Sequence, residues 1–306
     1  MGNHTSQNDF TLLGISDEPG LQVPLFLVFL VLYVVITFGN LIIIFIIWSE
    51  PHLHTAMYIF LCHLSILDIC NPSVTVPQML ANLLLEKKTI PVRGCITQFF
   101  FFIFFASSEC LLLSAMAYDR HVAICHPLRY SSIMNGDLCA HLAAASWLGG
   151  FLNSSMHTLA TCRLSFCGPR TIHHFFCDLP QVFTLSCTDP FINVLLVVVS
   201  GTIMGLGSFF ITIISYAYII FAVLKIDSET GRSKAFSTCS SHLLVVTFYY
   251  GAMFLTYLRP SSGYAMAEGR LLSVIYTVIT PLLNPLIYTL RNQEIIASSK
   301  KVLFTC

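Results

Sequence analysis

The sequence predicts an all-α membrane protein: a seven-transmembrane helix bundle followed by a short amphipathic C-terminal helix. Two observations lead to this prediction. The 306 residues are 56% hydrophobic and only 10% charged, with a mean hydropathy of +0.78, whereas soluble domains carry about 25% charged residues. The apolar residues also form runs long enough to cross ~30 Å of hydrocarbon, which takes about 20 helical residues. This composition excludes a soluble globular domain.

Seven apolar runs follow one another along the chain. The fifth is longer than one crossing needs, so we expect it to tilt or protrude. The connections are short, which predicts that consecutive helices are antiparallel neighbours; the longest connection is about Ala160–Pro190. The runs are Leu25–Trp48, Met57–Leu80, Cys95–Met116, Leu138–Leu159, Phe191–Leu224, Ala235–Leu258 and Leu271–Leu290.

The two ends of the chain differ in character. Residues 1–23 form a polar N-tail without a signal-peptide pattern, residues 24–290 the bundle, and residues 291–306 an amphipathic tail. In this tail, Ile295 and Ile296 precede Val302 and Leu303 by two turns, while Lys300 and Lys301 can reach lipid headgroups. A frayed tail is the alternative, but the pattern favours a helix on membrane lipid.

Orientation depends on the N-tail. Seven basic residues would lie on its side of the membrane and eight on the other, which is a poor positive-inside signal. The N-tail has no Lys or Arg, and Asn3-His4-Thr5 is a glycosylation acceptor that functions only outside the cell. We therefore expect an extracellular N-terminus with a glycan on Asn3. The formal net charge of zero argues against nucleic acid as a partner.

Two acids stand inside the apolar runs, Asp68 in the second and Glu109 in the third. An ionised acid at the bilayer centre costs about 2.5–3.5 kcal/mol on insertion scales, so both should face the bundle interior. Asn40 and Asn284 can join them in a polar cluster, and two facing acids repel unless a cation or a proton lies between them. Two hypotheses stay open: an allosteric Na⁺ site at Asp68, Glu109 and Asn284, or a hydrogen-bond network with one acid protonated. No other cofactor is indicated.

Two further motifs indicate a helix bundle that moves. Asp119-Arg120 ends the third run at the cytoplasmic edge, where Arg120 can pair with Asp119 or reach neighbouring helices. Pro281 and Pro285 each remove a backbone donor from the seventh run, and Asn284 offers a polar group in the weakened region. A loosened helix beside buried acids is typical of a moving element.

These motifs resemble those of rhodopsin-like G-protein-coupled receptors, with Asp68, Asp119-Arg120, Trp147 and Asn284–Tyr288 as the shared landmarks. More narrowly, the chain resembles the olfactory (odorant) receptor family, and its long loop looks like the terrestrial-type branch. The likeness runs from about Phe10 to Glu294, with two departures: His121 replaces the usual Tyr, and Ala56 replaces a Pro. The matching motifs are Leu61–Asp68, Met116–Tyr130 (MAYDRHVAICHPLRY), His174–Asp178 (HFFCD), Ser215-Tyr216, Lys234–His242 (KAFSTCSSH) and Pro281–Tyr288 (PLLNPLIY).

The resemblance implies that residues 1–306 form a single seven-transmembrane receptor domain. Its expected place is the plasma membrane, as a multi-pass protein in the cilia of olfactory sensory neurons. The expected function is to bind small, mostly neutral, hydrophobic volatile odorants in an outer transmembrane pocket and to activate a stimulatory, olfactory-type heterotrimeric G protein, which raises cyclic AMP. The resemblance also implies disulfides Cys95–Cys177 and Cys167–Cys187, whereas these four cysteines by themselves allow three pairings.

The resemblance further implies roles for individual residues. The ligand pocket lies among the outer halves of the third, fifth, sixth and seventh helices, under the long loop. Phe102 stands where amine receptors carry Asp, so a cationic ligand has no counter-ion, and the apolar lining with a few hydroxyls suits a neutral molecule. The implied ligand residues are Phe102, Ile103, Ala106, Ser107, Ser200, Met204, Tyr250, Met253, Phe254, Tyr257 and Thr277. The implied activation residues are Asp119, Arg120, Tyr216, His242, Asn284, Pro285 and Tyr288.

Other functions fit less well. A channel or transporter using Asp68 and Glu109 as an ion pathway is the main alternative, but neither a selectivity filter nor paired broken helices are indicated. The sequence has no H-E-x-x-H or G-x-S-x-G motif, so we do not expect an enzyme. Leu271–Leu290 lacks a Lys for a retinal Schiff base. A metal site in His174–Asp178 is disfavoured because a disulfide-bonded Cys177 offers no thiolate.

Overall fold

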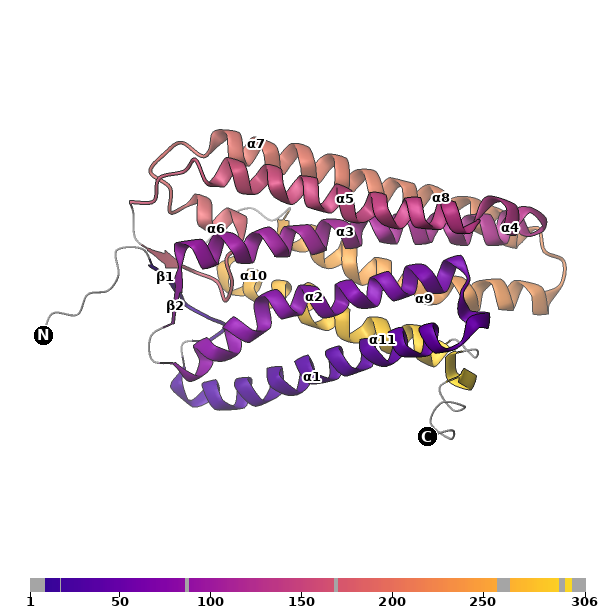
Figure 1. The fold of residues 1–306 in the computed structure, drawn as a ribbon, viewed down its shortest axis with the longest axis horizontal. Coiled ribbons are helices and arrows are strands. Elements are labelled where there is room, and N and C mark those ends of the chain that lie inside the picture. Colours follow the sequence, from indigo (N-terminus) through magenta and orange to yellow (C-terminus); the bar gives the residue numbers. More distant parts are fainter. Residues whose placement is uncertain are drawn as a thin grey trace, which may run out of the picture.

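A computed structural model describes residues 9–16, 18–85, 88–167, 170–257, 265–291 and 295–298. These residues form seven long helical segments that lie side by side (Figure 1). The first four are α1 (Pro19–Ser49), α2 (Ala56–Leu84), α3 (Val92–Cys125) and α5 (Gly136–Thr161). The sixth is α9 (Glu229–Tyr257).

The fifth and seventh segments each contain a π-helical stretch. The fifth consists of α7 (Phe191–Ser200), the π-helix η3 (Gly201–Leu206) and α8 (Gly207–Leu224). The seventh consists of α10 (Ala265–Val274), the π-helix η4 (Ile275–Ile279) and α11 (Thr280–Arg291). A π-bulge widens a helix locally and occurs often at functional sites. These stretches were not predicted from the sequence.

Short elements close the two ends of the bundle. At one end lie the strands β1 (Asp9–Leu12), β2 (Thr89–Pro91) and β3 (Thr171–Ile172) and the short helix α6 (Leu179–Phe183). At the other end lie η1 (Pro51–Leu53), η2 (Pro127–Arg129) and α4 (Tyr130–Ile133). We call the sheet together with the loop 162–190 the cap, and the end of the bundle that it covers the cap end.

The observed helices agree with the predicted runs except at their ends. Helix α1 starts at Pro19 instead of Leu25, because proline fits the first turn of a helix, where no backbone donor is needed. The long fifth run is one continuous helical segment of 34 residues. Among the described residues, five helices are long and apolar enough to cross a membrane. The remaining two segments, α5 and α9, complete the predicted all-α bundle.

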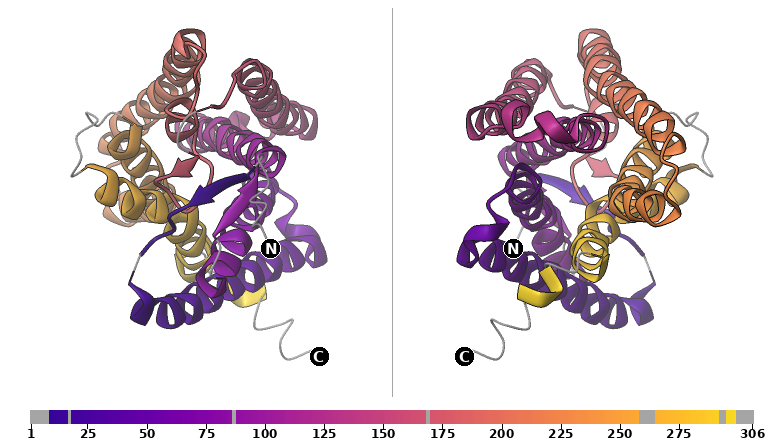
Figure 2. Two further views of the ribbon diagram at one scale, coloured as in Figure 1. Left: turned by 90° about the vertical axis from the view of Figure 1, so that its left-hand side faces the viewer. Right: turned by 90° about the vertical axis from the view of Figure 1, so that its right-hand side faces the viewer.

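The N-tail is partly folded. Strand β1 is the middle strand of the sheet, antiparallel to β2 and parallel to β3. Phe10 pairs with Ile90 and Leu12 with Ile172, and the side chains of both Phe10 and Leu12 are buried. Figure 2 (left) shows the strands lying across the end of the ring of helices. The predicted N-tail, residues 1–23, thus contains a strand and the start of α1, neither of which was predicted.

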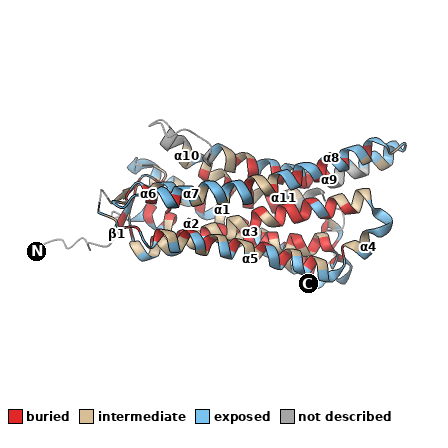
Figure 3. Cartoon of the chain, turned by 90° about the horizontal axis from the view of Figure 1, so that it is seen from above, coloured by how far each residue is buried: buried red, intermediate tan, exposed pale blue. Residues whose placement is uncertain are grey.

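Burial follows the pattern expected of a membrane bundle. Buried residues lie in the interior of the bundle (Figure 3). Many apolar side chains lie on the outside, including Val31, Ile203 and Phe221, each at least 60% exposed. At the end opposite the cap, Ile295 is buried against the main core cluster, and Ser298 Oγ lies 3.4 Å from His52 Nε2. The start of the predicted tail helix therefore packs on the bundle, while residues 299–306 lie outside the described residues.

Candidate functional site

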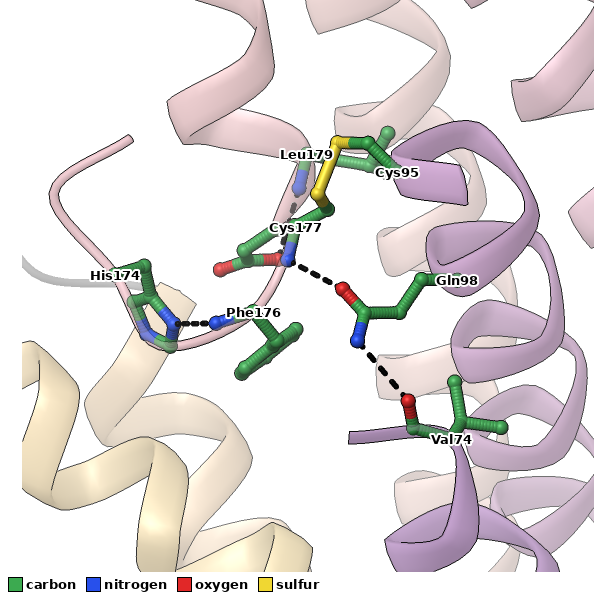
Figure 4. The surroundings of a disulfide bond; sticks show 8 residues. Val74, Cys95, Gln98, His174, Phe176, Cys177 and Leu179 are labelled. Atoms are coloured by element: carbon green, nitrogen blue, oxygen red, sulfur yellow. Dashed lines mark hydrogen bonds between the residues drawn. A yellow bond between two sulfur atoms is a disulfide. The ribbon is translucent and has the colours of Figure 1, made fainter. Parts of the chain in front are cut away.

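The long loop is fastened to the bundle beside α3. The structure joins Cys95 to Cys177, with their Cα atoms 5.5 Å apart, and Cys167 to Cys187, at 5.9 Å. These are the two pairs that the resemblance implies. One turn below Cys95, Gln98 accepts a hydrogen bond from the Cys177 N–H (2.9 Å) and donates to the Val74 carbonyl (3.0 Å) (Figure 4). Gln98 thus links the loop to both α2 and α3.

The HFFCD motif serves the packing of the cap. His174 is buried, its Nδ1 accepts from the Phe176 N–H (3.4 Å; Figure 4), and its Nε2 faces Ser273 Oγ at 3.1 Å. Burial and then the positive charge of Arg270 lower the pKa of His174 to about 3, so the imidazole is neutral. Asp178 caps α6 by accepting from the Leu179 N–H. Within the described part of the chain, no three His, Cys, Asp or Glu side chains form a metal cluster.

Phe102, the residue that would face a ligand amine, lies directly under the loop. Its ring centroid is 4.9 Å from that of Phe176 in the loop and 5.7 Å from that of Tyr276 in η4. Thr277, the next residue along η4, is fully buried and donates to the Ser273 carbonyl (2.6 Å). The loop, the third helix and the seventh therefore meet at an aromatic contact, and none of the described residues in this contact is an acid.

The two serines expected in the pocket are both bound by α5. Asn153 donates to Ser107 Oγ at 2.9 Å, and His157 Nε2 lies 2.9 Å from Ser200 Oγ. Asn153 and His157 were not among the predicted site residues. The signal that could have found them is their spacing of four residues, which places both on one face of the helix.

Below these serines, Tyr250 connects three helices. Its hydroxyl donates to Ser208 Oγ on α8 (2.8 Å) and lies 3.4 Å from the Cys110 carbonyl oxygen on α3. Cys110 Sγ is also within 2.8 Å of Ser208 Oγ. Ala106, another expected pocket residue, accepts a hydrogen bond from Tyr249 through its carbonyl (2.7 Å).

The remaining pocket candidates surround this Tyr250 centre. The Phe254 ring is 6.1 Å from that of Tyr250. The Met204 carbonyl oxygen accepts from Ser208 Oγ (2.5 Å). Met253 packs across Gly205, where a Cβ would lie 3.2 Å from its Cε. The Tyr257 side chain lies outside the described residues.

A cavity of about 360 Å³ opens between α6 and α7, outside the expected pocket. None of the expected ligand residues lines it. It adjoins them indirectly, because Val197 in its wall and Ile103 on α3 pack against the same apolar cluster. Its lining residues are Pro180, Phe183, Thr184, Pro190, Val194, Val197 and Val198.

The two buried acids and Asn284 lie in the middle of the bundle. Asn284 Nδ2 donates to both carboxylate oxygens of Asp68, at 2.9 and 3.0 Å. Asp68 and Glu109 are both at most 2% exposed. Glu109 Oε1, Asn284 Oδ1 and Asn40 Oδ1 have no hydrogen-bond partner among the described residues. Oxygen atoms of this kind suit a small hard cation.

At the end opposite the cap, Arg120 is held by its neighbour. Its Nη2 lies 2.7 Å from Asp119 Oδ2, and Tyr130 donates to the other carboxylate oxygen of Asp119 (2.8 Å). On the adjoining helices, the Tyr216 hydroxyl lies 2.7 Å from His242 Nδ1. The structure thus brings together four of the implied activation residues in two pairs. The Tyr288 side chain and Asn3 lie outside the described residues.

Comparison with known proteins decides the family. The olfactory receptor family model matches residues 29–305. The chain is 46% identical to human olfactory receptor 5AC1, over 96% of each chain. It is 47% identical to mouse olfactory receptor 5B21, over 99% of this chain and 95% of that one. It is 48% identical to gorilla olfactory receptor 1G1, over 99% and 96%.

The chain belongs to the olfactory receptor family. It is a multi-pass membrane receptor for odorants that couples to G protein, and it is not an enzyme. The channel or transporter alternative finds no support. In an olfactory receptor, the cap end with its aromatic contact at Phe102 is the candidate odorant site, and the end with Asp119 and Arg120 is the candidate coupling site.

Proposed function

We propose that this olfactory receptor binds small, mostly neutral, hydrophobic volatile molecules in the cap half of its bundle, and that binding activates a stimulatory, olfactory-type G protein and raises cyclic AMP. The observation that carries the proposal is the environment of Phe102. Its ring packs between Phe176 of the loop and Tyr276 of η4, so this part of the bundle is apolar, and Thr277 adds a hydroxyl beside Tyr276. Such a site favours a ligand held by shape and one or two hydrogen bonds.

Activation is a shift between two populations of the bundle. The odorant favours the state that binds G protein, and G protein in turn tightens odorant binding by the same factor. Tyr250 is suited to couple the two ends, because it hydrogen bonds to α8 and contacts α3 from its place on α9. At the coupling end, release of Arg120 from Asp119 frees the guanidinium for the partner.

The central acids add an allosteric Na⁺ site to the proposal. Asp68, Glu109 and Asn284 would hold the ion through carboxylate and amide oxygens, and the ion would supply the positive charge that two facing acids need. Two of these oxygens, Glu109 Oε1 and Asn284 Oδ1, have no hydrogen-bond partner within the described ranges, which supports a cation over a closed hydrogen-bond network.

We also propose an orientation and a cellular location for the receptor. The cap contains both disulfides and the strand formed by the N-tail, and disulfides persist in oxidising surroundings. This supports an extracellular N-terminus in the plasma membrane of olfactory cilia, with a glycan on Asn3. Loss of a glycosidase-sensitive mobility shift in Asn3→Gln, together with antibody access to an N-terminal tag on intact cells, tests the orientation.

A panel of chemically diverse odorants with a cyclic AMP reporter tests the function itself. Among the hits, Phe102→Ala should raise the half-maximal concentration by about 10- to 150-fold, because truncating a buried aromatic contact costs on the order of 1.5–3 kcal/mol. Phe101→Ala is the matched control, since the Phe101 ring is 40% exposed on the outside of the same helix. Equal effects of the two substitutions, at equal surface expression, would contradict the proposed site.

A further inference from the structure

Helix α5 supplies polar contacts to the candidate odorant site, although it does not belong to the expected pocket. Asn153 donates to Ser107 on α3, and His157 lies within hydrogen-bond distance of Ser200 at the end of α7. Asn153 and His157 are one helical turn apart. A role of the Asn153–Ser107 pair in odorant recognition rests on the proposed function.

The contact between α5 and α3 is fixed by close packing. A Cβ at Gly150 would collide with Ser108 Oγ and with the Phe104 carbonyl oxygen, so only glycine allows the two helices to approach this closely. One residue beyond Asn153, Ser154 donates to the Phe100 carbonyl (2.5 Å). Asn153 therefore stands in a part of the interface that has little freedom to shift.

The chemistry of the pair determines where the Ser107 proton goes. An amide NH₂ group only donates, whereas a hydroxyl carries one donor and two acceptor positions. The Asn153 amide occupies an acceptor position of Ser107 Oγ. Among the described residues, the Ser107 hydroxyl does not donate a hydrogen bond to any acceptor. That proton is therefore available to a ligand.

Ser107 also lies on the ligand side of α3. It follows Ile103 by four residues, so both occupy the same face of the helix. Ile103 packs against an apolar cluster that contains Leu179 and Phe183 of α6. The neighbouring Phe102 contacts Phe176 of the loop. A hydroxyl at this position, with one of its two acceptor positions engaged by Asn153, has its donor free for a ligand.

We propose that Asn153 is a positioning residue that makes Ser107 a hydrogen-bond donor toward the odorant. The preferred odorants are then neutral molecules with a hydrogen-bond acceptor and no donor, such as ketones, aldehydes and esters. A neutral hydrogen bond of this kind changes potency by about 3- to 10-fold. Alcohols of the same carbon skeleton accept the same bond, but their own O–H must compete with the Asn153 amide for Ser107 Oγ or stay unpaired, so they should be weaker agonists by that factor.

The test uses straight-chain methyl ketones and the matching secondary alcohols as probes, with the full-length receptor and a cyclic AMP reporter. In Asn153→Asp the carboxylate can only accept, so the Ser107 proton turns toward it and the free donor is lost. The ketone-to-alcohol preference should fall by about 3- to 10-fold. Ser107→Ala should abolish the same preference, and Asn153→Asp added to it should change the ratio no further.

Two further variants keep the result interpretable. Ser155→Asp adds an acid to the same helix at another position and should leave the preference unchanged. Asn153→Leu removes the amide without adding charge, and it replaces Asn153→Asp if that variant fails to reach the cell surface.

The outcomes separate the inference from the proposed function. A wild-type receptor that responds to these volatiles but prefers the alcohols, or an unchanged ratio in a surface-expressed Asn153→Asp or Asn153→Leu, overturns the inference alone. Silence of the wild-type receptor toward the whole odorant panel contradicts the proposed function instead.

Discussion

At the scale of single residues, the middle of the bundle is organised by one amide. Asn284 donates both of its bonds to Asp68, while the nearby Glu109 Oε1 has no partner in the described part of the molecule. Sodium binding here would stabilise one conformation by mass action. The same residues without sodium would form a network that does not respond to the choice of salt.

Sodium should therefore stabilise the purified receptor, and Asp68→Asn should abolish the effect. At a concentration about ten times the dissociation constant, binding contributes about 1.4 kcal/mol, or roughly 2–4 °C in Tm for a protein of this kind. The measurement is Tm in NaCl against choline chloride at equal ionic strength. An identical response to both salts in the wild type would support the proton-sharing network.

His174 gives the cap a dependence on pH. Its folded-state pKa of about 3 lies below the usual value of about 6.5 for an unfolded chain. The unfolded chain thus binds more protons between these values, so stability is full above about pH 6.5 and declines as pH falls toward 3. At pH 5 the loss amounts to about 2 kcal/mol.

Thermal unfolding between pH 7.5 and pH 5 should show this loss in the wild type and a smaller loss in His174→Gln. The neighbouring His173 is exposed, which makes His173→Gln the matched control. If the two substitutions leave the same pH dependence, burial of His174 is not its cause.

At the scale of elements, β1 holds the cap together. It is the middle strand, so its backbone joins β2 before α3 to β3 in the long loop. Its side chains alternate in burial: Phe10 and Leu12 are buried, whereas Thr11 is exposed. Phe10 also makes an edge contact with Phe166, with ring centroids 5.4 Å apart.

Phe10→Ala should destabilise the cap by about 3 kcal/mol, the low end for deleting a buried phenylalanine. Thr11→Ala should have little effect, because the side chain that it removes is exposed. Surface expression and hydrogen exchange at residues 88–91 and 170–174 report the change. Comparable exchange in the two variants would show that the strand is dispensable.

At the scale of the whole molecule, the Cys95–Cys177 bond closes a loop spanning 82 residues. Cys95→Ser should cost about 2–5 kcal/mol and lower surface expression, as removal of native disulfides usually does. Cys162→Ser is the control, because Cys162 is a free, exposed cysteine at the end of α5. Equal expression of both variants would contradict a stabilising role for the bond.

Length and hydropathy were sufficient to predict the seven helices, because crossing a bilayer imposes both. They were insufficient where a residue's role depends on which other residues it contacts in the fold. In the sequence, Asn153 is an ordinary polar residue, because its hydrogen bond to Ser107 exists only when α5 packs against α3. Strand β1 is four residues long, too short to predict from its alternation alone. The acids at Asp68 and Glu109 were identifiable in advance because charge inside an apolar run is rare.

The position of β1 has a consequence for biosynthesis. This segment is made first, yet its β3 partner is translated only after four of the long helices, with about 160 residues between the paired positions. With the extracellular N-terminus proposed above, this segment would stay unpaired on the lumenal side of the membrane until the middle of the chain has been inserted. Completion of the sheet would then report that the first half of the receptor has assembled, which is the kind of signal that quality control in the secretory pathway can read.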